Sequence, residues 1–263
     1  MLTTFQQTLK YQLDKAVENY NSSFFIDTDP IQIPHGFVLK EDIEIAGFMS
    51  ASIAWGQRKT IINNAKKLMQ MMDNTPHDFV MHASTAEIEL LKAFVHRTFN
   101  GNDLIYFIHS LRNIYEHSGG LETVFTQAYG ANASVYEALQ GFREAFLQLP
   151  HVPHVRKHVS DVSANSAAKR LHMFLRWMVR VDDKGVDFGL WKNISPAHLM
   201  LPLDVHTGDV ARAMGILNRK QNDYKAVIEI TDFLRLLDTE DPIKYDFALF
   251  GLGAFDYKNI PIV

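Results

Sequence analysis

The chain has 263 residues, 47% of them hydrophobic, which is enough to build a substantial core. Its formal net charge of −4 indicates no overall preference for a polyanionic partner. The absence of cysteine excludes disulfides, thiol nucleophiles and an iron–sulfur cluster held by thiolates. The N-terminal residues are polar and amphipathic, and no stretch approaches about eighteen apolar residues. We therefore expect a soluble, cytoplasmic protein that does not bind a membrane.

Apolar residues at helical spacing predict a first helix over residues 5–20. Residues 24–37 carry two prolines and a glycine, which predicts an extended connection. Between residues 43 and 72 the pattern indicates two helices that are broken near Trp55 and Gly56. The first quarter of the chain is therefore expected to be helical with one irregular segment.

The middle of the chain continues the helical pattern. Ser84 and Glu87 fit a capping box at the start of a helix whose apolar positions run to residue 95. Further helices are predicted over residues 104–115, ending before two glycines, and over residues 135–146, ending before a proline. No strand alternation is sustained in this region.

In the last third, Ser166 is expected to begin a helix, whereas residues 182–191 indicate a loop or hairpin. Ser195 and Asp241 each precede a proline, which is typical of a helix start. Asp204 can cap a helix that runs to a glycine at 215. The fold class is thus all-α. We expect residues 1–263 to form a single globular all-helical unit with two helical lobes and a cleft between them.

Basic residues are concentrated between residues 151 and 180. Six basic residues and one acidic residue give this segment a net charge of +5, so the rest of the chain carries −9. Lys169, Arg176 and Arg180 are spaced to share one face of a helix. Such a stripe is most often a solvated helix face, which the pattern alone favours. The alternative is a surface that follows nucleic acid phosphates by releasing counterions.

The order of motifs in the second half resembles the helix-hairpin-helix (HhH-GPD) DNA glycosylase superfamily, the group of endonuclease III and the oxoguanine glycosylases. In that family a lysine follows a Gly-x-Gly hairpin, and an aspartate lies in a V-D-x-H-x-x-R-V pattern. Asp204 lies in LDVH, followed by VAR at residues 210–212, which is similar to the second element. Lys169, within SAAKRLHMFLRWMVR, stands where the lysine is expected.

The resemblance extends over about residues 43 to 255. Residues 54–57 and 65–68 resemble the early helix pair of that fold, whose turn carries a residue that probes DNA, and YDFALFGLGAF at residues 245–255 resembles its closing helix. The chain as a whole also resembles an uncharacterised bacterial family distantly related to these glycosylases. The resemblance implies an HhH-GPD fold with two lobes.

The chain departs from the family in three respects. The stretch SDVSANSAAKR has no glycine, so the hairpin that grips a phosphate is absent or altered. The interval of 35 residues between Lys169 and Asp204 is longer than in endonuclease III and closer to the archaeal oxoguanine glycosylases. No four-cysteine iron–sulfur loop follows the closing helix.

The resemblance implies that Lys169 attacks the sugar as an amine nucleophile and that Asp204 stabilises the developing positive charge. Nearby cations and apolar side chains are expected to lower the pKa of this lysine. The implied partner is duplex DNA, from which the target base must be flipped into a pocket. Aromatic residues such as Phe174 and Trp177 could stack on that base, although at helical spacing they are more often ordinary core. The implied nucleic-acid-binding residues are Trp55, Gln57, Arg170, Arg176, Arg180 and His206.

Three histidines, His151, His154 and His158, have a spacing that could place them on one helix face around a metal. Pro153 interrupts that helix, and no carboxylate lies at matching spacing, so we predict no metal and no cofactor. His206 is expected to be a hydrogen-bond partner in a capping region rather than a catalytic base.

The sequence thus predicts a DNA glycosylase-like protein, with an AP-lyase activity as a further expectation, acting through Lys169 and Asp204. One alternative is a non-catalytic nucleic-acid-binding helical protein, and another is a helical small-ligand or interaction protein. Distance separates them, because a Lys169 amine more than about ten ångström from the Asp204 carboxylate is far beyond hydrogen-bond reach.

Overall fold

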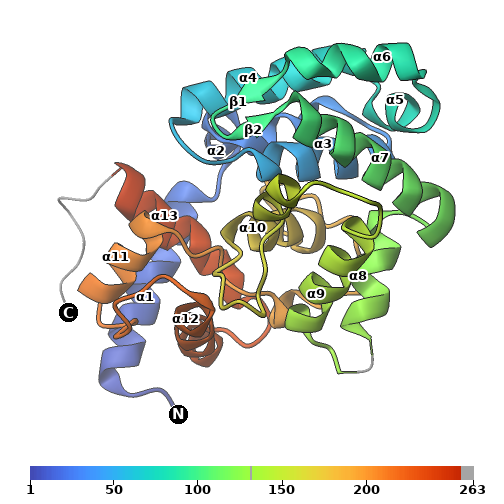
Figure 1. Ribbon diagram of the computed structural model, residues 1–263. Helices are drawn as coiled ribbons and strands as arrows, with labels where there is room; N and C mark the ends of the chain where they lie inside the picture. Colours follow the sequence, from blue (N-terminus) through green and yellow to red (C-terminus); the bar gives the residue numbers. More distant parts are fainter. Residues whose placement is uncertain (131, 256–263) are drawn as a thin grey trace. The chain divides into compact units, whose positions relative to one another are not determined.

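The computed structural model describes residues 1–130 and 132–255, which are mostly helical, as the sequence predicts. The chain divides into two compact units. We call residues 28–161 the central unit, and residues 1–27 together with the segment from residue 162 onward the terminal unit. The terminal unit thus combines the two ends of the chain (Figure 1). The cleft expected between two lobes stays a prediction.

The central unit is helical apart from one short hairpin. In chain order its elements are η1 (Pro30–Gln32), η2 (Pro34–Gly36), α3 (Lys40–Ser52), α4 (Arg58–Met71), α5 (Pro76–His82), α6 (Thr85–Leu90), η3 (Leu91–Ala93), β1 (Val95–His96), β2 (Phe99–Asn100), α7 (Gly101–Ser118), α8 (Leu121–Tyr129), α9 (Val135–Phe146) and η4 (Pro153–His158). The two strands pair antiparallel, with Val95 opposite Asn100.

The core of the central unit forms around α3, which is buried along nearly its whole length. Phe48 on this helix stacks on Phe107 from α7, with ring centroids 5.7 Å apart. Phe142 and Phe146 from α9 contact the same ring edge-on. Because these rings come from three helices, their burial fixes the scaffold from which α7 and η4 present their polar residues.

The terminal unit contains α1 (Thr4–Tyr20) from the start of the chain, and α2 (Ser23–Thr28) leads out of it. The remaining elements are α10 (Lys169–Val179), η5 (Pro196–His198), α11 (Val205–Ala213), α12 (Tyr224–Leu237), η6 (Pro242–Lys244) and α13 (Tyr245–Phe255). Helix α13 packs against both α1 and α11 (Figure 1). The core includes Trp177 and Trp191, which are almost completely buried.

Several sequence predictions are confirmed. Helix α1 covers the first predicted segment, and α3 and α4 are separated at the predicted break. Ser84 and Glu87 form the expected capping box. Helix α7 ends at Gly119, whose φ of 75° is a left-handed conformation that favours glycine. The two starts predicted at a proline are also confirmed: the proline after Ser195 begins η5, which is a single turn, and the proline after Asp241 begins η6, which continues into α13. These predictions are confirmed because each depends on local chemistry.

Other predictions were wrong. Residues 24–37 are not extended, because Asp29 caps η1 with a proline in its first turn, and η2 begins on another proline. The helix predicted from Ser84 to residue 95 ends at Leu90 and is followed by η3 and a strand. Helices α2, α5, α8 and α12 and the hairpin of β1 and β2 were not predicted.

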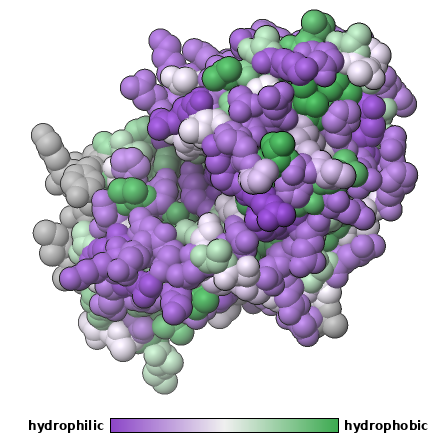
Figure 2. Space-filling view, in the orientation of Figure 1, coloured by the Kyte–Doolittle hydropathy of each residue, from purple (hydrophilic) through white to green (hydrophobic). Residues whose placement is uncertain are grey.

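None of the helices in the described part of the chain is both long and apolar enough to span a bilayer. Hydrophilic residues cover most of the face shown in Figure 2, with apolar residues in small groups between them.

Candidate functional site

Lys169 is the first residue of α10, and a tight turn over residues 162–165 holds it in place. The Tyr224 N–H donates to the Asn165 carbonyl at 3.1 Å, and the Asn165 side-chain amide donates to Asp223 at 2.9 Å. The Ala168 N–H donates to the Ser166 hydroxyl at 3.2 Å. These bonds tie the turn to the start of α12, so the position of Lys169 is set by backbone and side-chain contacts.

The sequence predicts that α10 begins at Ser166, but the helix begins three residues later. Ala168, the residue before it, has a φ of 45°, and Asn165 has a φ of 62°. Both are left-handed conformations, which cost an alanine roughly 1 kcal/mol or more. The stretch without glycine therefore still makes a turn of the kind that glycine favours, and buried Ala168 is held in it.

Asp204 is the N-cap of α11, as predicted. Its Oδ1 accepts the Thr207 N–H at 3.0 Å, while its Oδ2 lies 3.9 Å from the Lys169 Nζ. The two side chains are 26% and 25% exposed. One carboxylate oxygen thus accepts a hydrogen bond from the helix and the other faces the amine, so capping α11 leaves the second oxygen of Asp204 free to face Lys169.

Arg176 lies further along α10 and Arg180 is its C-cap, and each is only 3% exposed. Arg176 donates to Asp187 at 3.2 Å and is also paired with Asp246. Arg180 contacts Asp187 at 3.1 Å and Asp241 at 2.9 Å, and it pairs with Asp182 as well. We call these two arginines and four aspartates the buried ionic network.

The buried ionic network corrects the prediction of an exposed basic stripe, because neither arginine is available to bind phosphate or to be solvated. The loop that carries Asp182 and Asp187 folds back onto α10 and supplies the counter-charges. The Phe247 ring covers the same face, with its centroid 4.4 Å from the Arg176 guanidinium carbon. The arginines are thus part of the core of the terminal unit.

Asp246, at the start of α13, links the buried ionic network to the Lys169–Asp204 pair. Burial raises its pKa to about 6, and the negative charge of Asp204 adds to this effect. The charges of Arg176 and Lys169 oppose it. Because these charges act on one carboxyl group, Asp246 must lie within electrostatic reach of the candidate site.

The other predicted residues of the terminal unit have different environments. Arg170 is half-buried, and burial lowers its pKa to about 10. His206, in the first turn of α11, is exposed. Phe174 and Trp177 are fully buried, so they are core residues and not stacking surfaces.

Trp55 and Gln57 belong to the central unit. Gln57 is exposed at the N-cap position of α4, and Trp55 is half-buried. The Trp55 ring lies 5.0 Å from the His96 ring and 6.0 Å from the His158 ring. Their proposed roles in DNA contact remain predictions.

Sequence reasoning missed the aspartates that surround α10. Asp246 is the one acid in the apolar run YDFALFGLGAF. Asp187 lies in residues 182–191, for which the sequence indicated only a loop or hairpin and no partner. A lone acid in an apolar helix is a usable signal, because a carboxylate is almost never fully buried unless it is paired.

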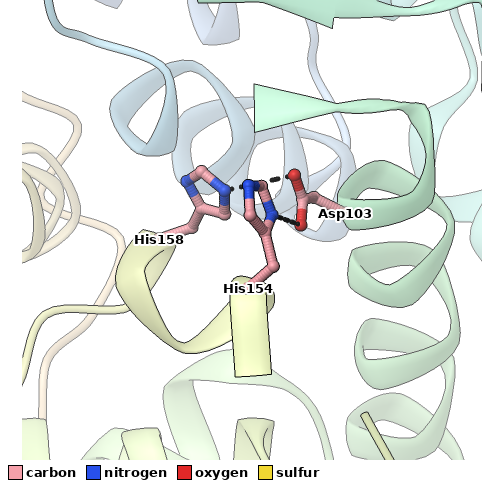
Figure 3. A group of neighbouring side chains, drawn as sticks. All are labelled: Asp103, His154 and His158. Atoms are coloured by element: carbon pink, nitrogen blue, oxygen red, sulfur yellow. Dashed lines mark hydrogen bonds and ion pairs between the residues drawn. The ribbon is translucent and has the colours of Figure 1, made fainter. Parts of the chain in front are cut away.

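The histidines were assessed incompletely as well. His154 and His158 lie on η4 and meet the carboxylate of Asp103 from α7 (Figure 3). The prediction of no metal relied on the lack of a carboxylate nearby in the sequence, whereas Asp103 lies 51 residues before His154. These three residues could hold a metal ion, and His151 is not one of them.

Residues 29–255 match the family described as "Protein of unknown function (DUF2400)". The chain belongs to this family. Neither a curated protein nor a solved structure matches the chain. The matched segment includes Lys169, Asp204 and Asp246, so the candidate site lies within the family domain.

Proposed function

We propose that this protein is a DNA glycosylase-like enzyme with AP-lyase activity that uses Lys169 as its amine nucleophile and Asp204 as the electrostatic partner. The observation that carries this proposal is the distance of 3.9 Å between the Lys169 Nζ and the Asp204 Oδ2. Lys169 is the first residue of α10 and Asp204 is the N-cap of α11, and they are 35 residues apart in the sequence. The proposal includes an HhH-GPD fold, duplex DNA as the partner and a cytoplasmic location.

The exposure of the pair supports a chemical role. Both side chains are about one quarter exposed, so a substrate can reach them while part of their surroundings is protein. This partial burial favours the proposal over the small-ligand or interaction alternative, in which the Lys169 face is plain surface. An ion pair at 3.9 Å is looser than the contacts in the buried ionic network, which leaves the amine able to move toward a substrate.

The chemistry follows from these two groups. The Lys169 ammonium must first lose a proton to water, because the Asp204 carboxylate, 3.9 Å from the amine, has to keep its negative charge for the later step. The amine then attacks the sugar carbon that bears the base, and the base leaves with the electrons of the broken carbon–nitrogen bond. The positive charge that develops on the sugar is stabilised by Asp204, whose negative charge is favoured at the N-terminus of α11.

The proposed reaction passes through a covalent imine between Lys169 and the sugar. After base loss, the sugar ring opens: the bond between C1′ and the ring oxygen breaks, the oxygen takes up a proton as a hydroxyl group, and the lysine adduct becomes an imine. Loss of a C2′ proton from this imine then expels the 3′ phosphate, which is the lyase step. All of these steps use groups of the chain, the substrate and water. The proposal therefore requires no cofactor.

The non-catalytic nucleic-acid-binding alternative predicted that the basic stripe binds DNA phosphates. Two of the three cations in that stripe are buried in ion pairs, which removes the main feature in its favour. Because the turn before Lys169 differs from that of the glycosylases, binding of DNA without catalysis is a separate outcome of the trapping experiment below.

Borohydride trapping tests the proposal. The protein is incubated with a duplex oligonucleotide that carries an abasic site, and borohydride reduces any imine to a stable cross-link. We expect trapping by the native protein and its loss in Lys169→Gln. Lys184→Gln is the control, because Lys184 is an exposed lysine of the same unit.

Two outcomes would overturn the proposal. If the native protein binds the duplex but forms no cross-link with it, the result favours binding without catalysis. Equal trapping by Lys169→Gln would show that another lysine reacts. Circular dichroism of each variant checks that the chain is folded.

A further inference from the structure

Asp103 is a buried carboxylate in the first turn of α7. Its residue is 1% exposed, and its Oδ2 accepts the Asn100 N–H at 2.9 Å as part of a capping box. Removing a carboxylate from water costs several kcal/mol unless partners replace the lost hydration. Strong partners must therefore compensate the charge of Asp103.

Two histidines supply these partners from η4. The His154 Nδ1 lies 2.7 Å from the Asp103 Oδ1, and the His158 Nε2 lies 3.2 Å from the Asp103 Oδ2. Figure 3 shows both rings turned toward the carboxylate, which comes from the neighbouring helix. One nitrogen of each ring and one carboxylate oxygen all lie within 4.8 Å of one another.

The surroundings hold His158 in this orientation. Its ring stacks on Trp55, with centroids 6.0 Å apart, and packs edge-on against Phe99 at 4.9 Å. The His158 side chain is 2% exposed, whereas the His154 side chain is 41% exposed. The group is thus fixed by the core on one side and accessible on the other, which gives an ion a path of entry.

We propose that Asp103, His154 and His158 form a site for a divalent transition metal ion of the zinc class. Two imidazole nitrogens and one carboxylate oxygen are a donor set that suits Zn²⁺, Co²⁺ or Fe²⁺, whereas Mg²⁺ and Ca²⁺ prefer oxygen ligands alone. Three protein ligands leave at least one coordination position for water or a substrate, as in catalytic zinc sites. The site lies in the central unit, so it goes beyond the function proposed for Lys169.

The geometry requires a limited movement of the ligands. Two ligands that are each about 2.1 Å from a tetrahedral ion lie roughly 3.4 Å apart. The three ligand atoms already lie within 4.8 Å of one another, so none has to approach another by more than about 1.4 Å. The His154 Nδ1 and the Asp103 Oδ1, now 2.7 Å apart, have to separate slightly to admit the ion. The exposed His154 ring can make this movement.

Lys157 gives the proposal a specific consequence. Its Nζ lies 2.6 Å from the His154 Nε2, so the ammonium donates to Nε2 and the Nδ1 proton is directed to Asp103. A metal at Nδ1 requires the other tautomer of the neutral ring, in which this proton has moved to Nε2, where it would face the Lys157 ammonium as a second donor. Lys157 must then turn away, which its exposed position allows. The lysine therefore opposes metal binding by both contact and charge.

Calorimetric titration of the chelator-treated, tag-free full chain with Zn²⁺, Co²⁺ and Mg²⁺ tests the site. We expect one equivalent of Zn²⁺ or Co²⁺ to bind and Mg²⁺ to bind far more weakly. His154→Ala should weaken binding by at least about tenfold, because it removes one of three ligands. Lys157→Gln should strengthen binding, because it removes the competing ammonium.

His151→Ala is the matched control. His151 lies on the same segment, but its ring nitrogens contact the Leu149 carbonyl and the Arg156 guanidinium, so its loss should leave the affinity unchanged. The proposal is overturned if the native protein binds no Zn²⁺ or Co²⁺ at one equivalent. It is also overturned if His154→Ala binds as tightly as the native protein, or if Lys157→Gln binds more weakly.

Discussion

Helix α10 and its C-cap carry two kinds of cation–carboxylate contact that differ in burial. Arg176 and Arg180 are almost fully buried, and each pairs with at least two aspartates. Lys169, at the start of the same helix, has one carboxylate at 3.9 Å and is about one quarter exposed. The two buried arginines each have at least two carboxylate partners and little contact with solvent, whereas a substrate can reach the partly exposed pair of Lys169 and Asp204.

This difference separates groups that maintain the fold from groups that can do chemistry. A buried, fully paired guanidinium cannot leave its partners without a large loss of free energy. A partly exposed amine that touches its partner loosely can exchange that contact for one with a substrate. We therefore expect substitutions in the buried ionic network to change stability strongly and substitutions of Lys169 or Asp204 to change activity strongly.

The largest effect on stability is expected from Arg176→Ala, which leaves Asp187 and Asp246 buried without this partner. We expect the free energy of unfolding to fall by about 3 to 5 kcal/mol. Urea denaturation followed by tryptophan fluorescence measures this change, because Trp177 and Trp191 are buried in the same unit.

Lys184→Ala is the control for this experiment. Lys184 pairs with Asp183 on the surface, so its loss should change the free energy of unfolding by less than about 1 kcal/mol. Equal changes in the two variants would contradict the distinction between buried and exposed pairs.

A smaller effect is expected from Asp246 and depends on pH. Burial raises the pKa of Asp246 to about 6 in the folded chain from 3.8, so the folded state holds a proton that the unfolded state has already released. The stability that this group contributes is therefore present below the unfolded pKa and is lost as pH rises through about 6. Between pH 4 and pH 7, the free energy of unfolding of the native chain should fall by on the order of 2 kcal/mol more than that of Asp246→Asn. Urea unfolding of both proteins across this range measures the difference, and parallel curves would contradict it.

The smallest effect on stability is expected at Asp204. Asparagine caps a helix nearly as well as aspartate, so Asp204→Asn should lower the free energy of unfolding by well under about 1 kcal/mol. Asp204→Ala removes the acceptor of the Thr207 N–H and should lose roughly that full amount. Thermal unfolding of the two variants gives the comparison, and equal losses would mean that the cap is not what Asp204 contributes to α11.

The sequence predicted features that depend on near neighbours. The Asp204 cap, the capping box at Ser84 and the end of α7 at Gly119 each follow from a few adjacent residues. The position of Lys169 opposite Asp204 was expected only through the resemblance, since 35 residues separate them. Local pattern was therefore enough to locate many helix ends.

The buried ionic network could not be predicted in this way. The spacing of Arg176 and Arg180 shows that they share a helix face, but not that a loop with Asp187 covers this face. The group of Asp103, His154 and His158 was missed for the same reason, because its carboxylate is distant in the sequence. Contacts between distant segments depend on packing, which periodicity does not contain.

The central claim is that Asp204 acts on a substrate as well as capping α11. The most direct test is the rate of base release by Asp204→Asn from a duplex with a damaged base, with the native protein as reference. We predict that the rate falls by about a hundredfold or more, as when one preorganised stabilising group is removed, while the variant stays folded. Base release at the native rate in Asp204→Asn, or none by the native protein on a panel of damaged bases, would contradict the claim and leave Asp204 as a helix cap alone.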